Sequence, residues 1–237
     1  MSGADEEKVA RRHVYGRTKG KTLKSRQAEL MQNFLPRLSL PRGEEMLAPQ
    51  ALFVPPRKSV WLEVGFGGGE HLLWQAQQNP DIGIIGCEPF VNGVAHLVQM
   101  MAENDPGNIR IHNDDAVFVL KRLPAASIER VFILYPDPWP KLRHKKRRFV
   151  NEGTLALIAN ALRPGGLLRF ASDIEDYVQW TLDHVARFNE KRGATFEWQA
   201  GDLAACRRRP ADWPQTRYEQ KALREGRTPA YLEFRRL

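Results

Sequence analysis

The sequence predicts an α/β fold in which a mainly parallel sheet of seven strands is covered by helices on both faces. Short apolar segments, each long enough for one strand, alternate along the chain with amphipathic segments of helical length. A run of glycines directly follows the first apolar segment, as expected where a parallel strand turns sharply into a helix. Ligands bind such sheets outside the carboxyl ends of the strands, so these ends are where a site is expected.

The predicted elements follow one another from residue 59 onward. Strands are expected at residues 59–64, 82–88, 109–112, 130–135, 167–172, 195–199 and 230–235. Helices are expected at residues 70–78, 90–103, 115–123, 151–162 and 174–191. A Pro-Gly-Gly turn at residues 163–166 separates the fourth of these helices from the next strand, and residues 200–229 are expected to be irregular and basic.

Residues 1–54 precede the predicted α/β domain of residues 55–237. Residues 1–24 are polar and basic, and we expect them to be mobile in the absence of a partner. An amphipathic helix is predicted from Ala28 to Leu35, because apolar residues recur at helical spacing and Pro36 is expected to end it. Prolines at positions 41, 49, 55 and 56 then indicate a linker.

The net charge of +8 is concentrated in two stretches. The chain has 36 Lys and Arg residues against 28 Asp and Glu residues. Residues 141–148 contain six basic and no acidic side chains, and removing both stretches leaves 22 basic against 28 acidic residues, a net charge of −6. The other stretch contributes eight: Lys8, Arg11, Arg12, Arg17, Lys19, Lys21, Lys24 and Arg26. Basic clusters on an otherwise acidic chain predict contacts with a polyanion such as RNA.

Composition excludes several classes of protein. An apolar content of 42% with 9% aromatic residues is too rich for a disordered chain. No apolar run approaches the roughly 18–20 residues that span a bilayer, and the first residues lack the apolar core of a secretory signal. The two cysteines, Cys87 and Cys206, have no metal-ligand spacing and provide no disulfide framework. We therefore expect a cytoplasmic protein with no metal and no membrane contact.

The glycine-rich turn after the first strand indicates the class of ligand. Residues 63–70 read EVGFGGGE. The dinucleotide fingerprint G-x-G-x-x-G would need glycine at position 70, and the carboxylate of Glu70 would oppose a pyrophosphate. Gly65, Gly67 and Gly69 instead fit E-x-G-x-G-x-G, which resembles the first motif of S-adenosylmethionine-dependent methyltransferases. A nicotinamide oxidoreductase and an ordinary tight turn are the alternatives.

Carboxylates follow the next two predicted strands. Glu88 ends the second strand, where a carboxylate accepts hydrogen bonds from ribose hydroxyls in nucleotide-binding folds. Asp115 follows the third strand, where it suits an adenine amino group. The N-cap of the following helix is an equally good role for Asp115, and Asp114 is an adjacent candidate for the adenine contact.

The loop after the fourth strand is the most specific stretch of the sequence. Residues 135–148 read YPDPWPKLRHKKRR. Three prolines at alternate positions stiffen the backbone and fix the directions of Asp137 and Trp139, an acid and a ring that suit a planar base. The basic side chains that follow suit phosphates, and the expected contacts are Arg143, Lys145, Lys146, Arg147 and Arg148.

These segments together resemble the tRNA (guanine-N7)-methyltransferases, from about Tyr15 to the C-terminus. The matching residues are 62–70, 86–89, 115–116, 136–139, 141, 143–148, 171–173 and 216–219. The resemblance implies a Rossmann-like class I methyltransferase fold with one antiparallel strand, S-adenosyl-L-methionine as methyl donor, and tRNA as partner. It also implies that the product is 7-methylguanosine in the variable loop. Ser172 and Pro140 depart from the family, which usually has threonine and often histidine at these positions.

The resemblance also implies roles for individual residues. The methyl donor would be bound by Glu63, Gly65, Gly67, Gly69, Glu88, Asp115 and Asp137. The substrate RNA would be contacted by Lys141, Asp173, Thr216, Arg217, Tyr218 and Glu219. Asp137 would be the catalytic residue through positioning, because guanine N7 has a lone pair and no proton to remove.

Several alternatives remain at the level of the sequence. The Asp137-Pro138-Trp139 loop loosely resembles the D-P-P-Y loop of methylases that act on exocyclic amino groups. A non-catalytic RNA-binding adaptor on the same fold is a further alternative, although the predicted donor-binding acids are all present. The sequence leaves open whether the protein is a monomer or a homodimer. We expect residues 8–26 to be an arm that orders on tRNA and adds affinity without contributing to donor binding.

Overall fold

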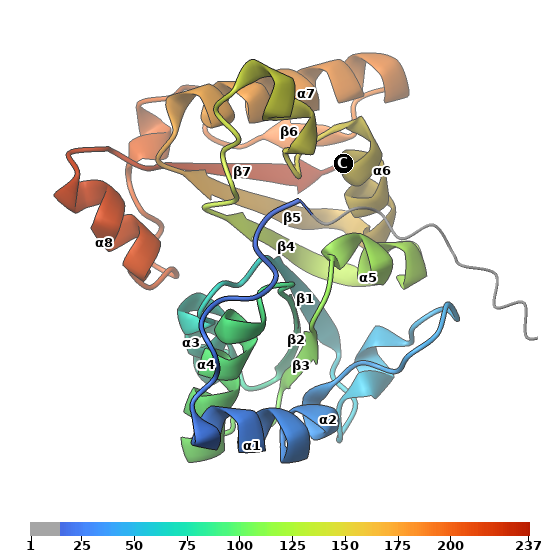
Figure 1. Ribbon diagram of the computed structural model, residues 1–237. Coiled ribbons are helices and arrows are strands. Elements are labelled where there is room, and N and C mark those ends of the chain that lie inside the picture. Colours follow the sequence, from blue (N-terminus) through green and yellow to red (C-terminus); the bar gives the residue numbers. More distant parts are fainter. Residues whose placement is uncertain (1–14) are drawn as a thin grey trace, which may run out of the picture.

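The computed structural model describes residues 15–237, so Lys8, Arg11 and Arg12 of the predicted arm lie outside the described residues. Within residues 15–237 seven strands form one sheet with the order β3-β2-β1-β4-β5-β7-β6 (Figure 1). The strands are β1 (Ser59–Val64), β2 (Ile82–Cys87), β3 (Ile109–His112), β4 (Ile128–Leu134), β5 (Leu162–Ser172), β6 (Phe196–Trp198) and β7 (Ala230–Arg236).

Only β7 runs against the other described strands. It pairs antiparallel with both β5 and β6, whereas β1 to β5 pair in parallel. The predicted mainly parallel seven-stranded sheet is therefore confirmed, including its one antiparallel strand. The fifth strand is longer than expected, because the register of β5 on β4 shifts where residues 163–166 bulge outward between two paired segments.

Helices cover both faces of the sheet (Figure 1). They are α1 (Ser25–Asn33), α2 (Leu35–Leu38), α3 (Glu70–Gln78), α4 (Val91–Glu103), α5 (Ala116–Arg122), α6 (Glu152–Ala161), α7 (Glu175–Arg192) and α8 (Arg217–Arg224). Short 3-10 turns lie at Pro49–Leu52, Leu142–Arg147 and Ala205–Arg207. Within residues 15–237 no helix is both long and apolar enough to cross a membrane.

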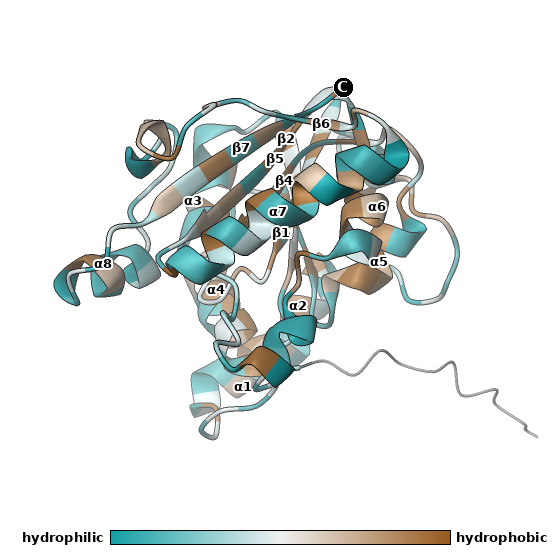
Figure 2. Cartoon of the chain, turned by 90° about the horizontal axis from the view of Figure 1, so that it is seen from above, coloured by the Kyte–Doolittle hydropathy of each residue, from teal (hydrophilic) through white to brown (hydrophobic). Residues whose placement is uncertain are grey.

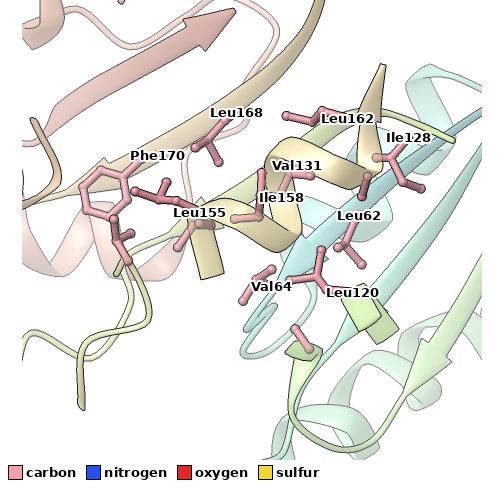
Figure 3. Close-up of a cluster of buried hydrophobic side chains, with 14 of the residues drawn as sticks. Leu62, Val64, Leu120, Ile128, Val131, Leu155, Ile158, Leu162, Leu168 and Phe170 are labelled. Atoms are coloured by element: carbon pink, nitrogen blue, oxygen red, sulfur yellow. The ribbon is translucent and has the colours of Figure 1, made fainter. Parts of the chain in front are cut away.

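Alternate residues of each central strand belong to different hydrophobic clusters. Leu62 and Val131 point into a cluster with α5, α6 and α7, part of which Figure 3 shows. Trp61 and Phe132 point the other way, into a cluster with α1 to α4. Figure 2 shows the hydrophobic colour along β4, β5 and β7 and the hydrophilic colour on much of α7 and α8. A sheet that is buried on both faces leaves its strand ends as the place for a site.

The structure differs from the sequence predictions in the helical segments as well. Pro36 does not end the helical region, because it lies in the first turn of α2, where a missing N–H costs no hydrogen bond. Residues 200–229 are not wholly irregular, since they contain α8, which Thr216 begins as N-cap. Residues 15–21, which belong to the predicted arm, make hydrogen bonds to α4.

The buried side chain of Arg148 ties the loop after β4 to α7. Its Nε donates to the carbonyl oxygen of Pro138 at 2.9 Å, and its Nη1 donates to the backbone oxygen of Asp176 at 3.1 Å. The guanidinium also pairs with the Asp176 carboxylate and lies over the rings of Tyr177 and Trp180, 4.7 and 5.0 Å from the ring centroids. The sequence prediction that Arg148 contacts phosphate is therefore wrong, because this side chain has no exposed surface.

We expect Arg148→Met to lower the free energy of unfolding by about 2–3 kcal/mol, because it removes a charged donor and a cation–π contact in the interior. Urea unfolding measures this change. Arg143→Met is the matched control, since Arg143 is an exposed arginine of the same basic run and its loss should change stability by less than about 0.5 kcal/mol. Equal effects of the two substitutions would contradict the anchoring role of Arg148.

Candidate active site

A cavity of about 430 Å³ opens at the carboxyl ends of β1, β2 and β4. The strand order reverses between β1 and β4, which is the point where open α/β sheets bind ligands. The volume lies within the range of about 300–1000 Å³ that is typical of small-molecule sites. Its wall includes Tyr15, Gly16, Arg17, Gly65, Gly67, Glu88, Phe90, Asp115, Tyr135, Asp137, Trp139, Arg147, Phe149 and Tyr218.

The glycine-rich turn forms one side of the cavity and is held from behind by α4. Gly67 has φ +58°, a left-handed conformation that favours glycine, and its N–H donates to Glu88 Oε2 at 2.7 Å. A Cβ at Gly93 of α4 would lie 2.1 Å from the carbonyl oxygen of Gly67, so only glycine permits this approach. His96 Nδ1 lies 2.8 Å from the Gly68 oxygen and ties α4 to the turn a second time.

Glu88 presents a nearly buried carboxylate to the cavity. Its two oxygens accept backbone hydrogen bonds from Gly67 at 2.7 Å and from Phe90 at 2.8 Å. Burial raises the pKa of Glu88 above its usual value, and the negative charge of Asp137 raises it further, although the two backbone donors oppose this shift. A carboxylate has about four acceptor positions, so two remain for a ligand with paired hydroxyl groups.

Asp137 lies on the loop after β4, between two residues with unusual backbone conformations. Tyr135 and Trp139 have φ values of +50° and +42°, in the left-handed region that is costly for large side chains. The side chain of Asp137 is exposed at the cavity wall, and partial desolvation of its carboxylate raises its pKa above the usual value. The loop therefore stores strain while it holds an acid in a fixed place.

Asp115 and Asp114 differ in their relation to the cavity. Asp115 lies on the cavity wall, and its Oδ1 accepts the N–H of Val117 at 3.0 Å as the N-cap of α5. Asp114 is absent from the wall, and its Oδ1 accepts the N–H of Asp115 at 2.8 Å. The cap geometry of Asp115 is thus compatible with a second role facing the cavity.

Two of the residues expected to bind the donor lie behind the wall rather than on it. The carboxylate of Glu63 is buried, and its Oε2 lies 2.8 Å from His71 Nδ1, an interaction that joins β1 to α3. Gly69 is the N-cap of α3, and its backbone passes against the side chain of Leu97. Both residues shape the turn that carries Gly65 and Gly67.

The segment that begins α8 lies over the glycine-rich turn. A Cβ at Gly67 would lie 3.1 Å from the ring of Tyr218, and this ring is nearly parallel to that of Tyr135. Arg217 Nε lies 3.3 Å from Glu70 Oε1, at the start of α3. Tyr218 therefore helps to enclose the cavity, although it belongs to a part of the chain that is far away in the sequence.

The other residues of that segment, and Asp173, are engaged within the protein. Thr216 Oγ1 accepts the N–H of Glu219 at 3.2 Å and so caps α8. The buried carboxylate of Glu219 lies 3.3 Å from Arg209 Nε. Asp173 accepts a hydrogen bond from Arg227 Nε at 2.6 Å.

The basic run of residues 141–148 divides into residues with different surroundings. Lys141, Arg143 and Lys146 are exposed. Lys145 Nζ donates to Asp176 Oδ1 at 2.6 Å. Arg147 lies on the cavity wall, with its guanidinium carbon 4.9 Å and 5.0 Å from the ring centroids of Tyr15 and Trp139. Three exposed cations thus lie in the short run between the wall residues Trp139 and Arg147.

Sequence reasoning missed part of the wall. Tyr15, Arg17, Phe90 and Phe149 line the cavity, but none of them had been assigned to the site. The glycines at positions 16 and 20 were a signal within the basic arm, since isolated glycines mark places where a backbone passes close to other groups. Among residues 15–237 no group of three or more His, Cys, Asp or Glu side chains is arranged to hold a metal ion.

Comparison with known proteins identifies relatives over nearly the whole chain. Residues 57–231 match the family model described as "Putative methyltransferase". The tRNA (guanine-N(7)-)-methyltransferase of Ruegeria sp. (strain TM1040) is 49% identical over 233 residues, which cover 95% of this chain and 88% of that protein. The protein of the same name from Rhizobium meliloti (strain 1021) is 49% identical over 223 residues and covers 94% of each chain.

Solved structures of methyltransferases have the same fold as this chain. The 16S rRNA methyltransferase KamB has a TM-score of 0.51 and 15% identity, over 83% of this chain and 96% of its own. An antibiotic-related methyltransferase has a TM-score of 0.50 and 12% identity, over 92% and 97%. The expected Rossmann-like methyltransferase fold is therefore confirmed. From its sequence relatives, the chain belongs to the tRNA (guanine-N7)-methyltransferase family.

Proposed function

We propose that this chain transfers the methyl group of S-adenosyl-L-methionine to N7 of a guanine in tRNA. The observation that carries the proposal is a cavity walled by the carboxylates of Glu88 and Asp137 at the reversal point of the sheet, with exposed cations beside it. The names of the relatives support the reaction, and the resemblance of residues 136–148 supports the base.

The chemistry of the wall fits a nucleoside that is cationic and lacks phosphate. Glu88 has acceptor positions left for ribose hydroxyls, and Asp115 faces the same cavity for an adenine amino group. Glu70 and Glu88 flank the glycine-rich turn, so a pyrophosphate would meet two negative charges there. Glu63 and Gly69 support this site indirectly, since they fix the turn from behind.

When bound, S-adenosyl-L-methionine supplies an activated methyl group on a sulfonium cation. Guanine N7 carries an in-plane lone pair and no proton, so no side chain has to act as a base. The task left to the protein is to hold the two reactants in line, which contributes on the order of 7–11 kcal/mol in well-oriented systems. We assign this task to Asp137, whose carboxylate suits the N1–H and N2–H₂ edge of guanine, with Trp139 and Tyr218 as rings beside it.

Exposed cations next to the cavity account for binding of the RNA backbone. Lys141, Arg143 and Lys146 follow the loop that carries Asp137, and they are available to phosphates. Arg217, at the start of α8, adds a further positive charge near Glu70, beside the glycine-rich turn. Asp173, Thr216 and Glu219 act through the position of this segment, because their polar groups are already engaged.

The direct test is incubation of methyl-labelled S-adenosyl-L-methionine with unmodified tRNA, followed by chemical cleavage specific for 7-methylguanosine. The proposal requires the label at N7 of a guanine. Label on an exocyclic amino group would instead indicate the amino-methylase alternative, and donor binding without any transfer would indicate an RNA-binding adaptor.

Asp137→Ala should lower kcat by about 100-fold or more while the folded state is retained, because the group that orients the base is lost. Single-turnover methylation measures the chemical step, and calorimetry measures donor affinity separately. Asp183→Ala is the control, since Asp183 lies on α7 and is not part of the cavity wall. Full turnover in Asp137→Ala would contradict the assignment.

Asp115→Ser should raise the Kd for the donor about tenfold, because serine keeps the N-cap but is too short to reach a ligand in the cavity. Asp114→Ser is the control and should leave the Kd unchanged. Calorimetric titration with S-adenosyl-L-methionine measures both. A larger effect at position 114 would transfer the adenine contact to Asp114.

The affinity for the donor should fall as the pH is lowered. This loss should occur at a higher pH than the protonation of ordinary carboxyl groups would cause, because the pKa values of Glu88 and Asp137 are both raised. The cationic donor needs the ionised forms, which are lost as pH falls through these raised values. The free energy of unfolding has the opposite pH dependence. The two groups contribute stability at low pH, and this contribution is lost as the pH rises through their pKa values in the folded state. Donor titrations from pH 8 to 5 test this, and Asp137→Asn should flatten the profile. A profile of Asp137→Asn as steep as that of the parent would contradict this origin.

A further inference from the structure

Residues 15–21, which we name the strap, pass along the cavity and contact the two segments on either side of it. They run from the loop after β4 to the start of α4 before the chain enters α1 (Figure 1). Tyr15, Gly16 and Arg17 belong to the cavity wall. The strap is therefore part of the enclosure of the pocket, although the sequence suggested a separate RNA-binding arm.

The first end of the strap lies against the loop that carries Asp137. The ring of Tyr15 meets Trp139 edge to face, with centroids 6.5 Å apart, and Arg147 lies over both rings. A Cβ at Gly16 would lie 3.1 Å from Asp137 Oδ2, so the backbone of the strap passes directly beside this carboxylate. A substitution at Gly16 would therefore press against the carboxylate of Asp137, the proposed positioning residue.

The second end of the strap is held by the side-chain amide of Asn92, the second residue of α4. Asn92 Oδ1 accepts the N–H of Gly20 at 2.7 Å, and Asn92 Nδ2 donates to the carbonyl oxygen of Lys21 at 2.7 Å. The N–H of Val91 donates to the Thr18 oxygen at 3.0 Å. One side-chain amide thus holds the backbone of two successive residues.

The contact at Gly20 leaves no room for a side chain. A Cβ there would lie 2.7 Å from Asn92 Oδ1 and 2.8 Å from the ring of Phe90, which itself lines the cavity. The residues of the strap are nevertheless exposed, and exposed hydrogen bonds of this kind open readily. The strap therefore packs closely against Asn92 and Phe90, but its exposed hydrogen bonds hold it there only weakly.

We propose that the strap, latched by Asn92, closes over the bound methyl donor and must open for the donor to enter and the demethylated product to leave. This inference rests on the proposed donor site. Lys19 and Lys21 are exposed on the strap, so contacts with tRNA phosphates favour its closed position. Binding of tRNA and retention of the donor are then positively coupled, and the coupling is reciprocal.

The test compares Asn92→Ala with Asn104→Ala, a control at the exposed C-terminal cap of α4. Dissociation of S-adenosylhomocysteine is measured by stopped-flow displacement. Asn92→Ala should release it about tenfold faster than the parent, because two hydrogen bonds of the closed strap are lost, and Asn104→Ala should match the parent. Asn92→Asp keeps the acceptor for Gly20 and loses the donor to Lys21, so it should fall between them.

Brief trypsin digestion followed by mass spectrometry measures how readily the strap opens, through the rate of cleavage after Arg17, Lys19 and Lys21. S-adenosylhomocysteine should slow these cleavages in the parent and Asn104→Ala, and much less in Asn92→Ala. Adding tRNA should slow ligand release from the parent more than from Asn92→Ala. Unchanged release and equal protection in Asn92→Ala would overturn the proposal, whereas failure of the parent to bind the ligand at all would instead overturn the proposed function.

Discussion

The close packing of α4 against the glycine-rich turn is the constraint on which the site depends. Gly93 allows the helix to approach the Gly67 carbonyl, and this approach aims the Gly67 N–H at Glu88. The same helix supplies Asn92, which holds the strap through two hydrogen bonds. The N-terminal end of α4 therefore fixes three parts of the site: the glycine-rich turn, the carboxylate of Glu88 and the strap. A shift of α4 would disturb all three together.

The distribution of charge follows from the two partners that the site must hold. Inside the cavity, desolvation raises the cost of ionising Glu88 and Asp137, and the charge of Asp137 adds to that cost at Glu88. A cationic ligand relieves this cost. Outside it, the basic side chains that remain exposed point toward solvent, where phosphates are accessible. Arg148 belongs to neither group: its buried guanidinium is used to hold the loop between them.

Much of this arrangement could be predicted from the sequence, because local patterns determine it. Strand and helix periodicity predicted the sheet, and strand ends predicted that Gly65, Glu88, Asp115 and Asp137 converge. The side-chain environment of the basic run could not be predicted, since Arg147 and Arg148 are adjacent and equally charged yet face different surroundings. Helix α8 was missed although Thr216-x-x-Glu219 is a capping pattern, because the surrounding composition is that of a loop. The position of the strap depends on a contact between residues 72 apart in the sequence, Gly20 and Asn92, which no local pattern encodes.

The most direct measurement is a crystal structure of the protein with S-adenosylhomocysteine. The account predicts the nucleoside in the cavity between the glycine-rich turn and the loop after β4, with its ribose hydroxyls on Glu88 and its adenine beside Asp115. It also predicts residues 15–21 closed over the ligand, with the sulfur toward Asp137. A ligand bound outside this cavity, or bound within it with its adenosine remote from Glu88 and Asp115, would contradict the account.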